Sequence, residues 1–430
     1  QKISYTVAEQ TVTGYTSNIT GSMEDGYTIT NSYTPDSVSV SVRKVWDDAN
    51  DFYEKRPESV NVTLYTVTQS EDKVSTGKTL TLNAANNWSG TFTELHKYSS
   101  AGVKAKYTVE ESTVPNGYTE TVAGKMDTGY TITNTLTRDA SFTVSKSATN
   151  EYGTADNNST FTFQLTLNGK PVTDAQVKIG DGAAAAIGSN GTFQLKNGQT
   201  ATISNLPVLP EGVTYTVTEI FSGNAGNAWT TTTNAGTKEP RVASVADNGS
   251  VTFNNARISR TITVNKTWVD GGENGRQETH FTLQKKVGND WADVTSASTK
   301  GNSVSFIVPK FDENGTEIVY QVTEDVPAGY TVDGNPKTVD KNGTVAFTNT
   351  RRMQVVVKKE WQTNGIKVTT NPTVKFQLYK GDQAVEGQTK ELTDGNNSVT
   401  FTDLPYSTEY TVEEVSIEGG EIAMLDENGN

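Results

Sequence analysis

Residues 262–268 read ITVNKTW, and their alternation decides which kind of fold to expect. Ile262, Val264, Lys266 and Trp268 fall on one parity, so in a β-strand they share the face that apolar neighbours bury. The pattern predicts a half-buried strand, and it also directs a lysine ammonium toward the core. Because an isolated buried charge is very costly, this lysine needs a chemical explanation.

Composition points to the same fold class. Only 33% of the 430 residues are hydrophobic, and Val, Thr, Tyr and Ile alternate in short runs between Asn-Gly and Asp-Gly pairs. No apolar run approaches the ~18 residues that a membrane span needs. These features predict an all-β chain without membrane insertion, and the length predicts roughly three or four domains.

Charge and missing residue types argue against several function classes. The net charge of −14 argues against nucleic acid or an anionic membrane as the partner. With no cysteine and only two histidines, neither thiol chemistry nor a His-rich metal site is expected. No G-x-S-x-G or HExxH motif is present, so we expect no cofactor, no metal and no turnover enzyme. The acidic stretches at 46–51, 312–315 and 426–429 do not match an EF-hand loop and are interpreted as solvated turns.

Three short phrases recur in a constant order along the chain. An opening phrase such as VSVRKVW carries a lysine, a middle phrase such as YTVEE ends on a glutamate, and a closing phrase such as GYTITNT carries an asparagine. Successive glutamates lie 102, 108, 105 and 90 residues apart, so the repeating unit has the size of a domain. The residues selected in this way are Lys44, Lys146, Lys266 and Lys359; Glu9, Glu111, Glu219, Glu324 and Glu414; and Asn31, Asn134, Asn255 and Asn349.

The phrases divide the chain into repeats. Residues 1–35 are the C-terminal part of a truncated repeat, 36–137 and 258–351 are complete, 138–257 is complete but divergent, and 352–430 lacks its closing strand. Only 9 to 12 residues separate each closing asparagine from the next opening lysine, and most of these belong to strands. We therefore expect a stiff array of neighbouring repeats without flexible spacers.

Parity directs the glutamates and asparagines inward as well as the lysines. Tyr107, Val109 and Glu111 share one face of their strand, and so do Ile132 and Asn134. A buried salt bridge would explain the lysine and the glutamate but not the asparagine. The alternative for each lysine is a strand-end side chain that reaches solvent, and for each glutamate an ordinary edge-strand charge.

A reaction accounts for all three residue types together. Burial lowers the pKa of an amine and makes it a nucleophile, and burial raises the pKa of a carboxyl group and keeps it protonated. The protonated glutamate could polarise the asparagine carboxamide and move protons while ammonia leaves. The product, a Lys–Asn isopeptide bond, is a neutral amide that removes the buried charge. This self-crosslinking happens once per site and is not turnover.

Three motifs together resemble the B-type repeat domains of the collagen-adhesin family, which occur in surface proteins and pilins of Gram-positive bacteria. They are the K-x-W opening, the YTVxE phrase followed by P-x-G-Y (VPNGY at 114–118 and VPAGY at 326–330), and the closing TNT. The resemblance implies Greek-key β-sandwiches of the inverse-immunoglobulin or transthyretin type, with about seven strands each. It also implies spontaneous isopeptide bonds: Lys44–Asn134 with Glu111, Lys146–Asn255 with Glu219, and Lys266–Asn349 with Glu324. Lys359 with Glu414 lacks its asparagine, and Asn31 with Glu9 lacks its lysine.

The repeat at 138–257 departs from this pattern. It lacks the tryptophan two residues after Lys146, lacks P-x-G-Y, and offers both Asn254 and Asn255. Parity with Val251 and Phe253 selects Asn255.

The resemblance implies a structural stalk or shaft segment of a bacterial cell-surface adhesin or pilus-like fibre, extracellular and anchored to the cell wall by a C-terminus outside this sequence. A pilin subunit and a module that binds a host ligand or glycan are the alternatives. Host extracellular matrix or glycan would be bound through a domain not present here, and the longest repeat, 138–257, is the candidate for a binding module within the chain. Trp46, Trp268 and Trp361 are expected to cover the lysines, whereas Trp88, Trp229 and Trp291 are the candidate sugar platforms.

Overall fold

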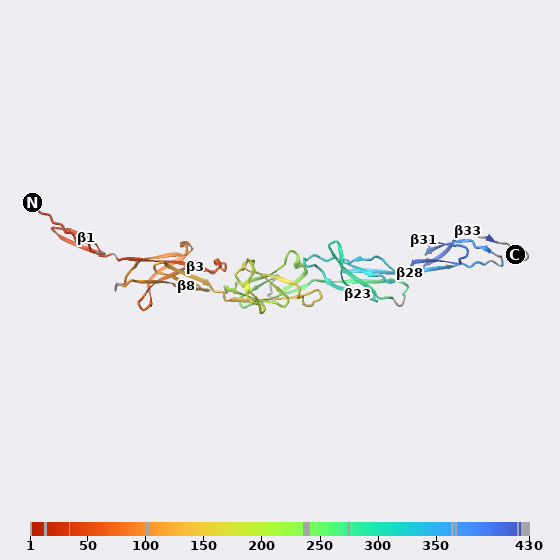
Figure 1. Cartoon of the computed structure of the whole chain (residues 1–430), viewed down its shortest axis with the longest axis horizontal. Helices are drawn as coiled ribbons and strands as arrows, with labels where there is room; N and C mark the ends of the chain where they lie inside the picture. The colour runs from red at the N-terminus through yellow and green to blue at the C-terminus, as the bar shows by residue number, and fades with distance from the viewer. Residues whose placement is uncertain are drawn as a thin grey trace. The chain divides into compact units, whose positions relative to one another are not determined.

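The computed structural model describes residues 2–12, 15–33, 35–99, 103–234, 241–272, 276–362, 365, 368–418 and 421–422. The acidic stretch at 426–429 therefore lies outside the described residues. Nearly all of the regular structure is β-strand (Figure 1), and three short 3-10 helices, η1 (Ala49–Asp51), η2 (Ala84–Asn86) and η3 (Ala225–Ala228), accompany the strands in the described ranges. None of the helices described is long and apolar enough to cross a bilayer.

The chain falls into two compact units. The first contains residues 1–147, 157–220 and 231–254, and the second contains residues 148–156, 221–230 and 255–430. We describe their sheets in chain order.

The first unit begins with a hairpin and a sandwich. The hairpin consists of β1 (Tyr15–Ser22) and β2 (Gly26–Tyr33). The sandwich has one sheet of four strands in the order β6 (Ser89–His96), β3 (Ser37–Asp47), β9 (Gly129–Leu136), β8 (Tyr118–Lys125), and one of three in the order β5 (Lys73–Asn83), β4 (Ser59–Val67), β7 (Lys106–Glu111). Both sheets contribute to one core, for example Val40 and Ile132 from one and Val62 and Val109 from the other.

The next two sheets come from the divergent repeat. One has the order β14 (Ala185–Ala186), β13 (Gln176–Ile179), β16 (Thr200–Leu206), β10 (Ala140–Thr149), β20 (Ser250–Arg257), β18 (Trp229–Thr233). The other has the order β12 (Lys170–Pro171), β11 (Thr160–Leu167), β17 (Tyr215–Ile220), β19 (Val242–Val245), with β15 (Thr192–Lys196) also paired to β11.

The second unit contains a further sandwich and the strands of the last repeat. The sandwich has the sheets β24 (Ser303–Pro309), β21 (Ser259–Val269), β28 (Thr344–Lys358), β26 (Tyr330–Val332) and β23 (Asp290–Thr299), β22 (Thr279–Val287), β25 (Tyr320–Asp325), β27 (Lys337–Thr338). The last repeat contributes β29 (Val368–Thr370), β30 (Thr373–Lys380), β31 (Gln383–Leu392), β32 (Ser398–Pro405), β33 (Tyr410–Glu418) and β34 (Glu421–Ile422). β32 pairs with the C-terminal half of β28, so one long strand serves both repeats.

The first and last strands of each sandwich lie side by side. β3 pairs with β9 in parallel, with Lys44 opposite Ile132 and Trp46 opposite Asn134. β21 pairs with β28 in parallel in the same register, with Lys266 opposite Phe347 and Trp268 opposite Asn349. In the divergent repeat, β10 and β20 are likewise neighbours. The predicted all-β fold of tandem Greek-key sandwiches is confirmed, and its topology brings the opening and closing phrases together.

Candidate functional site

The alternation of the opening strands aims each lysine inward. In β3, Val40, Val42 and Lys44 are buried while Ser41 and Arg43 between them are exposed. Lys146 and Lys266 are 2% and 4% exposed, so all three lysines lie inside their sandwiches. In the repeats at 36–137 and 258–351, the asparagine lies two positions after the residue that pairs with the lysine on the neighbouring strand. The two side chains therefore project from the same face of adjacent strands.

In the repeat at 258–351 the three side chains are in direct contact. The Lys266 amine lies 3.1 Å from Glu324 Oε1, and both side chains are fully shielded from solvent. Asn349 Nδ2 donates a hydrogen bond of 2.5 Å to the same carboxyl oxygen. Glu324 therefore bridges the amine and the carboxamide.

The repeat at 36–137 has the same arrangement with looser contacts. The Lys44 amine lies 3.8 Å from Glu111 Oε2 and donates to the Val45 carbonyl at 3.3 Å. Asn134 Nδ2 donates to Glu111 Oε1 at 3.3 Å. Both members of the ion pair have no exposed side-chain surface.

The divergent repeat brings together its lysine and glutamate. The Lys146 amine lies 3.3 Å from Glu219 Oε1 and donates to the Phe253 carbonyl at 3.3 Å. The Thr231 hydroxyl donates to Glu219 Oε2 at 3.3 Å, a partner that sequence reasoning missed. Asn255 is buried on β20 and Asn254 is exposed, as parity predicts.

Burial sets the protonation of these groups. Loss of hydration lowers the pKa of the Lys44 and Lys146 amines to about 8, although the carboxylates beside them oppose the change. Burial lowers the pKa of Lys266 in the same way. Burial also raises the pKa of Glu111, against the opposing influence of Lys44 and Asn134. In the repeat at 36–137 the two changes favour a neutral amine beside a neutral carboxyl group.

Several polar atoms around these amines have no hydrogen-bond partner among the described residues. They are the carboxamide oxygens of Asn134 and Asn349 and one carboxyl oxygen, Oε2, of Glu111 and of Glu324. A buried polar atom without a partner typically costs about 1–3 kcal/mol, so the unreacted sites are energetically unfavourable.

The pairs near the two ends of the chain lie in more open surroundings. Asn31 Nδ2 donates to Glu9 Oε1 at 2.7 Å, with Asn31 exposed. The Lys359 amine lies 2.6 Å from Glu414 Oε2, and these side chains are 22% and 30% exposed. Both pairs are thus assembled, but neither is desolvated like the three complete sites.

The tryptophans of the opening strands lie over their lysines. The amines of Lys44, Lys266 and Lys359 are 4.3, 4.6 and 4.8 Å from the ring centroids of Trp46, Trp268 and Trp361. In the divergent repeat Phe161 takes this place, 4.1 Å from the Lys146 amine.

Two of the candidate sugar platforms have structural partners instead. Trp229 is only 7% exposed, and Trp88 packs edge-on against Trp46 with ring centroids 5.1 Å apart. The prediction for Trp229 is wrong, because this buried ring has little accessible face, whereas Trp88 is partly buried and its role as a sugar platform stays a prediction. Trp291 is partly buried on β23.

The acidic stretch at 46–51 also has an internal explanation. Asp48 is buried and accepts hydrogen bonds from Arg56 and from the Tyr118 hydroxyl. Within the described ranges, no group of three or more His, Asp or Glu side chains is placed to hold a metal ion.

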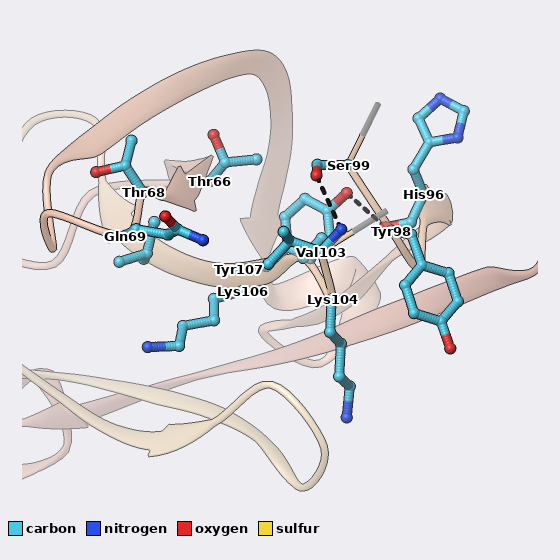
Figure 2. A pocket seen from close by; sticks show the side chains of 12 residues that line it. Thr66, Thr68, Gln69, His96, Tyr98, Ser99, Val103, Lys104, Lys106 and Tyr107 are labelled. Carbon is cyan, nitrogen blue, oxygen red and sulfur yellow. Dashed lines mark hydrogen bonds between the residues drawn. The ribbon is translucent and has the colours of Figure 1, made fainter. Parts of the chain in front are cut away.

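One pocket of the first unit lies apart from these sites. It has a volume of about 730 Å³ and lies beside the ends of β4, β6 and β7 (Figure 2). Figure 2 shows Tyr107 at its wall, where the Tyr107 hydroxyl donates to the His96 carbonyl at 2.9 Å. None of the lysine, glutamate or asparagine residues of the sites lines it.

Comparisons with known proteins group most of the chain with one family. The model of the family described as Cna protein B-type domain matches residues 1–32, 40–135, 262–350 and 355–430. A separate model, for a domain of unknown function, matches residues 140–257. The divergent repeat therefore differs from its neighbours at the level of family models as well.

Among curated proteins, the chain is similar to a collagen adhesin of Staphylococcus aureus, with 31% identity over all of this chain and 34% of the relative. The chain thus spans about a third of the length of that relative. Among solved structures, two B repeat units of the collagen-binding protein of the same organism match with 27% identity, 89% of this chain, 94% of that chain and a TM-score of 0.25. The major pilin of Streptococcus pyogenes matches with 17% identity, 52% of this chain, 99% of that chain and a TM-score of 0.25.

Proposed function

Because the chain belongs to the Cna protein B-type domain family, we propose that it is a stalk segment of a bacterial cell-surface adhesin or pilus-like fibre, stiffened by three autocatalytic Lys–Asn isopeptide bonds. The repeats would be 36–137, 138–257 and 258–351, flanked by the partial repeats 1–35 and 352–430. The observation that carries the proposal is the desolvated contact of Lys266, Glu324 and Asn349.

The chemistry follows from the groups in contact. The neutral Lys266 amine attacks Cγ of Asn349, and the new C–N bond forms as the carbonyl π electrons move to Oδ1. Glu324 accepts a proton from the attacking nitrogen and delivers one to Nδ2, so that ammonia leaves when the C–Nδ2 bond breaks. Atoms balance as amine plus carboxamide giving isopeptide amide plus ammonia.

A protonated glutamate could also polarise the carboxamide of Asn349. Asn349 Nδ2 donates to the glutamate as placed, and Oδ1 lacks a partner. Rotating the amide by half a turn would bring Oδ1 to the carboxyl group, which could then donate its proton and polarise Cγ. The same reasoning applies to Asn134 and Glu111.

The placement of the bonds suits a mechanical role. Each bond would join the first and last strands of a sandwich, which are neighbours in one sheet and pair in parallel in the repeats at 36–137 and 258–351. Tension entering one strand would then leave through the other across the covalent link. By the chain-entropy estimate used for disulfides, closing a loop of ~100 residues contributes roughly 4–5 kcal/mol. Unlike a disulfide, the amide resists reduction.

On this proposal the protein works outside the cell, anchored to the wall by sequence beyond this chain, and its constant partners are its own neighbouring repeats. The collagen-adhesin relative suggests that a separate domain of the whole protein contacts host matrix.

Intact mass spectrometry of the full chain tests the proposal. We expect a mass short by three ammonia molecules, and one ammonia should return in each of Glu111→Gln, Glu219→Gln and Glu324→Gln. Glu110→Gln is the matched control, because Glu110 pairs with Lys73 at the surface and should leave all three bonds intact. A full mass in the wild type would refute the crosslinks.

A further inference from the structure

Two aspartates that the reaction does not use occupy equivalent places beside two of the sites. Asp48 follows Lys44 by four positions and Trp46 by two. Asp270 stands in the same relation to Lys266 and Trp268. The lysine, tryptophan and aspartate of each K-x-W-x-D run therefore alternate with the residues between them and share one side of the chain. Both aspartates are 2% exposed. Buried carboxylates need strong partners, and these have them.

Asp48 is the centre of a hydrogen-bond cluster. Arg56 donates to it from Nε at 3.0 Å and from Nη2 at 2.6 Å, and the Tyr118 hydroxyl donates at 3.1 Å. The backbone N–H of Asp51 donates at 3.1 Å. Burial alone would raise the pKa of Asp48, but these donors hold it below its usual value, so the carboxylate stays charged.

Asp270 repeats the cluster with different loop residues. Arg276 donates from Nε at 2.8 Å and from Nη2 at 2.7 Å, and the Tyr330 hydroxyl donates at 3.2 Å. The bonds from Arg276 are the main reason that the pKa of Asp270 falls to about 2. The arginine follows the aspartate by eight positions in one repeat and six in the other, so the geometry recurs although the loop does not.

The partners of each aspartate hold the tryptophan that covers the amine. The Arg56 guanidinium lies 5.4 Å from the Trp46 ring centroid, and the Tyr118 ring meets Trp46 edge-on at 5.2 Å. In the other repeat the corresponding distances to the Trp268 ring are 5.4 Å for Arg276 and 5.0 Å for Tyr330.

The P-x-G-Y phrase delivers the tyrosine. The Tyr118 N–H donates to the Pro115 carbonyl at 3.1 Å, and Gly117 has φ +82°. Tyr330 and Pro327 form the same turn, with Gly329 at φ +81°. A turn with positive φ at its third position favours glycine, which explains the residue before the tyrosine.

The divergent repeat lacks the tryptophan, the aspartate and the tyrosine turn of this arrangement. Ala148 and Asn150 stand where the tryptophan and aspartate stand elsewhere, no P-x-G-Y follows Glu219, and Phe161 covers the amine instead. Tryptophan, aspartate and the tyrosine turn are therefore present together or absent together in the three complete repeats.

We propose that Asp48 and Asp270 are positioning residues for isopeptide formation, which clamp an arginine and a tyrosine onto the tryptophan and so keep a closed aromatic cover over the lysine amine. The inference rests on the proposed function. Because the aspartate and arginine charges offset each other, the clamp adds little net field at the amine, and its effect is to exclude water. Water reaching the amine would stabilise the ammonium and remove the nucleophile.

The test follows bond formation in newly made full-length chain. Cell-free synthesis is quenched at intervals, and peptide mass mapping gives the linked fraction at Lys44–Asn134 and at Lys266–Asn349. We expect Asp48→Asn to slow the first linkage tenfold or more at neutral pH and to leave the second at the wild-type rate. Asp270→Asn should do the reverse, and the exposed neighbour Asp47 supplies the control Asp47→Asn.

The pH dependence separates positioning from a general structural defect. A full return of the Lys44 pKa from about 8 to 10.5 would reduce the neutral amine roughly 300-fold near neutral pH, and alkaline solution would restore it. Raising the pH from about 7 to about 9 should therefore speed the linkage in Asp48→Asn by up to about 100-fold, against about tenfold in the wild type. The positioning role would be overturned if alkaline pH did not relieve the slow linkage in Asp48→Asn. It would also be overturned if all variants formed their bonds with the same time course.

Two further measurements keep the test decisive. If Asp48→Asn does not fold, Tyr118→Phe removes one bond of the clamp and should slow the same linkage a few-fold. In the Glu111→Gln background, where no bond can form, acylation of Lys44 by a water-soluble reagent at about pH 11, where the amine is largely neutral with or without its cover, should rise at least tenfold when Asp48→Asn is added. Unchanged labelling of Lys44 would refute the claim that Asp48 keeps the aromatic cover closed. A wild-type chain without any linkage would instead refute the proposed function.

Discussion

At the scale of single residues, the cost of burying charge explains the composition of the sites. Lys44 and Glu111 have no exposed side-chain surface. Burial lowers the pKa of Lys44 and raises that of Glu111, and each change favours the neutral form of the group. The unreacted pair leaves Asn134 Oδ1 without a partner among the described residues. An isopeptide bond would replace the Lys44 amine and the Asn134 carboxamide by one neutral amide, which is far cheaper to bury than an ammonium beside a carboxylate.

A variant that cannot react should reveal the trapped amine through its pH dependence. In Glu111→Gln, Lys44 keeps a folded-state pKa below 10.5, so the unfolded chain binds more protons than the folded chain in that range. The stability of the 36–137 repeat should therefore rise as the pH increases from about 8 toward 10.5, whereas the wild-type repeat, with its amine consumed, should not show this gain.

Calorimetry of the full chain between these pH values measures the effect. The control is the double variant Lys44→Met/Glu111→Gln, which has no titrating amine at the site. A Glu111→Gln transition that follows the control at every pH would contradict the buried, depressed amine.

At the scale of elements, the parallel pairing of opening and closing strands creates the site. Strand parity buries the asparagine, and the register places it two residues beyond the position opposite the lysine. Shifting a strand by one residue would turn the asparagine to solvent. The divergent repeat tests this rule, because β20 carries two adjacent asparagines, of which Asn255 is buried and Asn254 exposed.

Substitution of each asparagine should separate their roles. We expect Asn255→Ala to return one ammonia to the mass of the chain, because its carboxamide is the one on the buried face with Phe253. Asn254→Ala should leave the mass deficit unchanged apart from the substitution itself. Peptide mapping of the Lys146 crosslink reads out both variants, and a crosslink to Asn254 would overturn the parity argument.

At the scale of the whole molecule, the proposed bonds act in series along the chain. Lys44 and Asn134 are 90 positions apart, and a bond between them would keep the intervening residues out of the path of tension. The same holds for the other complete repeats. The array would then resist extension even where its hydrogen bonds yield.

Single-molecule stretching of the full chain measures this directly. Glu111→Gln should add one unfolding step of roughly 300 Å, at about 3.4 Å for each released residue, which the wild type lacks. The Glu110→Gln control should extend like the wild type. A wild-type chain that already releases this length under force would contradict the covalent path.

The sequence by itself determined the all-β class, the repeats and the three residue types of each site, because strand parity and a domain-sized period are local properties. It also selected Asn255 over Asn254. It did not reveal the clamp: Asp48 was interpreted within a solvated turn, although it holds Arg56 and Tyr118. Nor did it show that Trp229 lies inside the fold, that Trp88 packs against Trp46, or that Phe161 covers Lys146. These contacts join residues far apart in the chain, and only the packing of one sheet on the other decides which side chains meet.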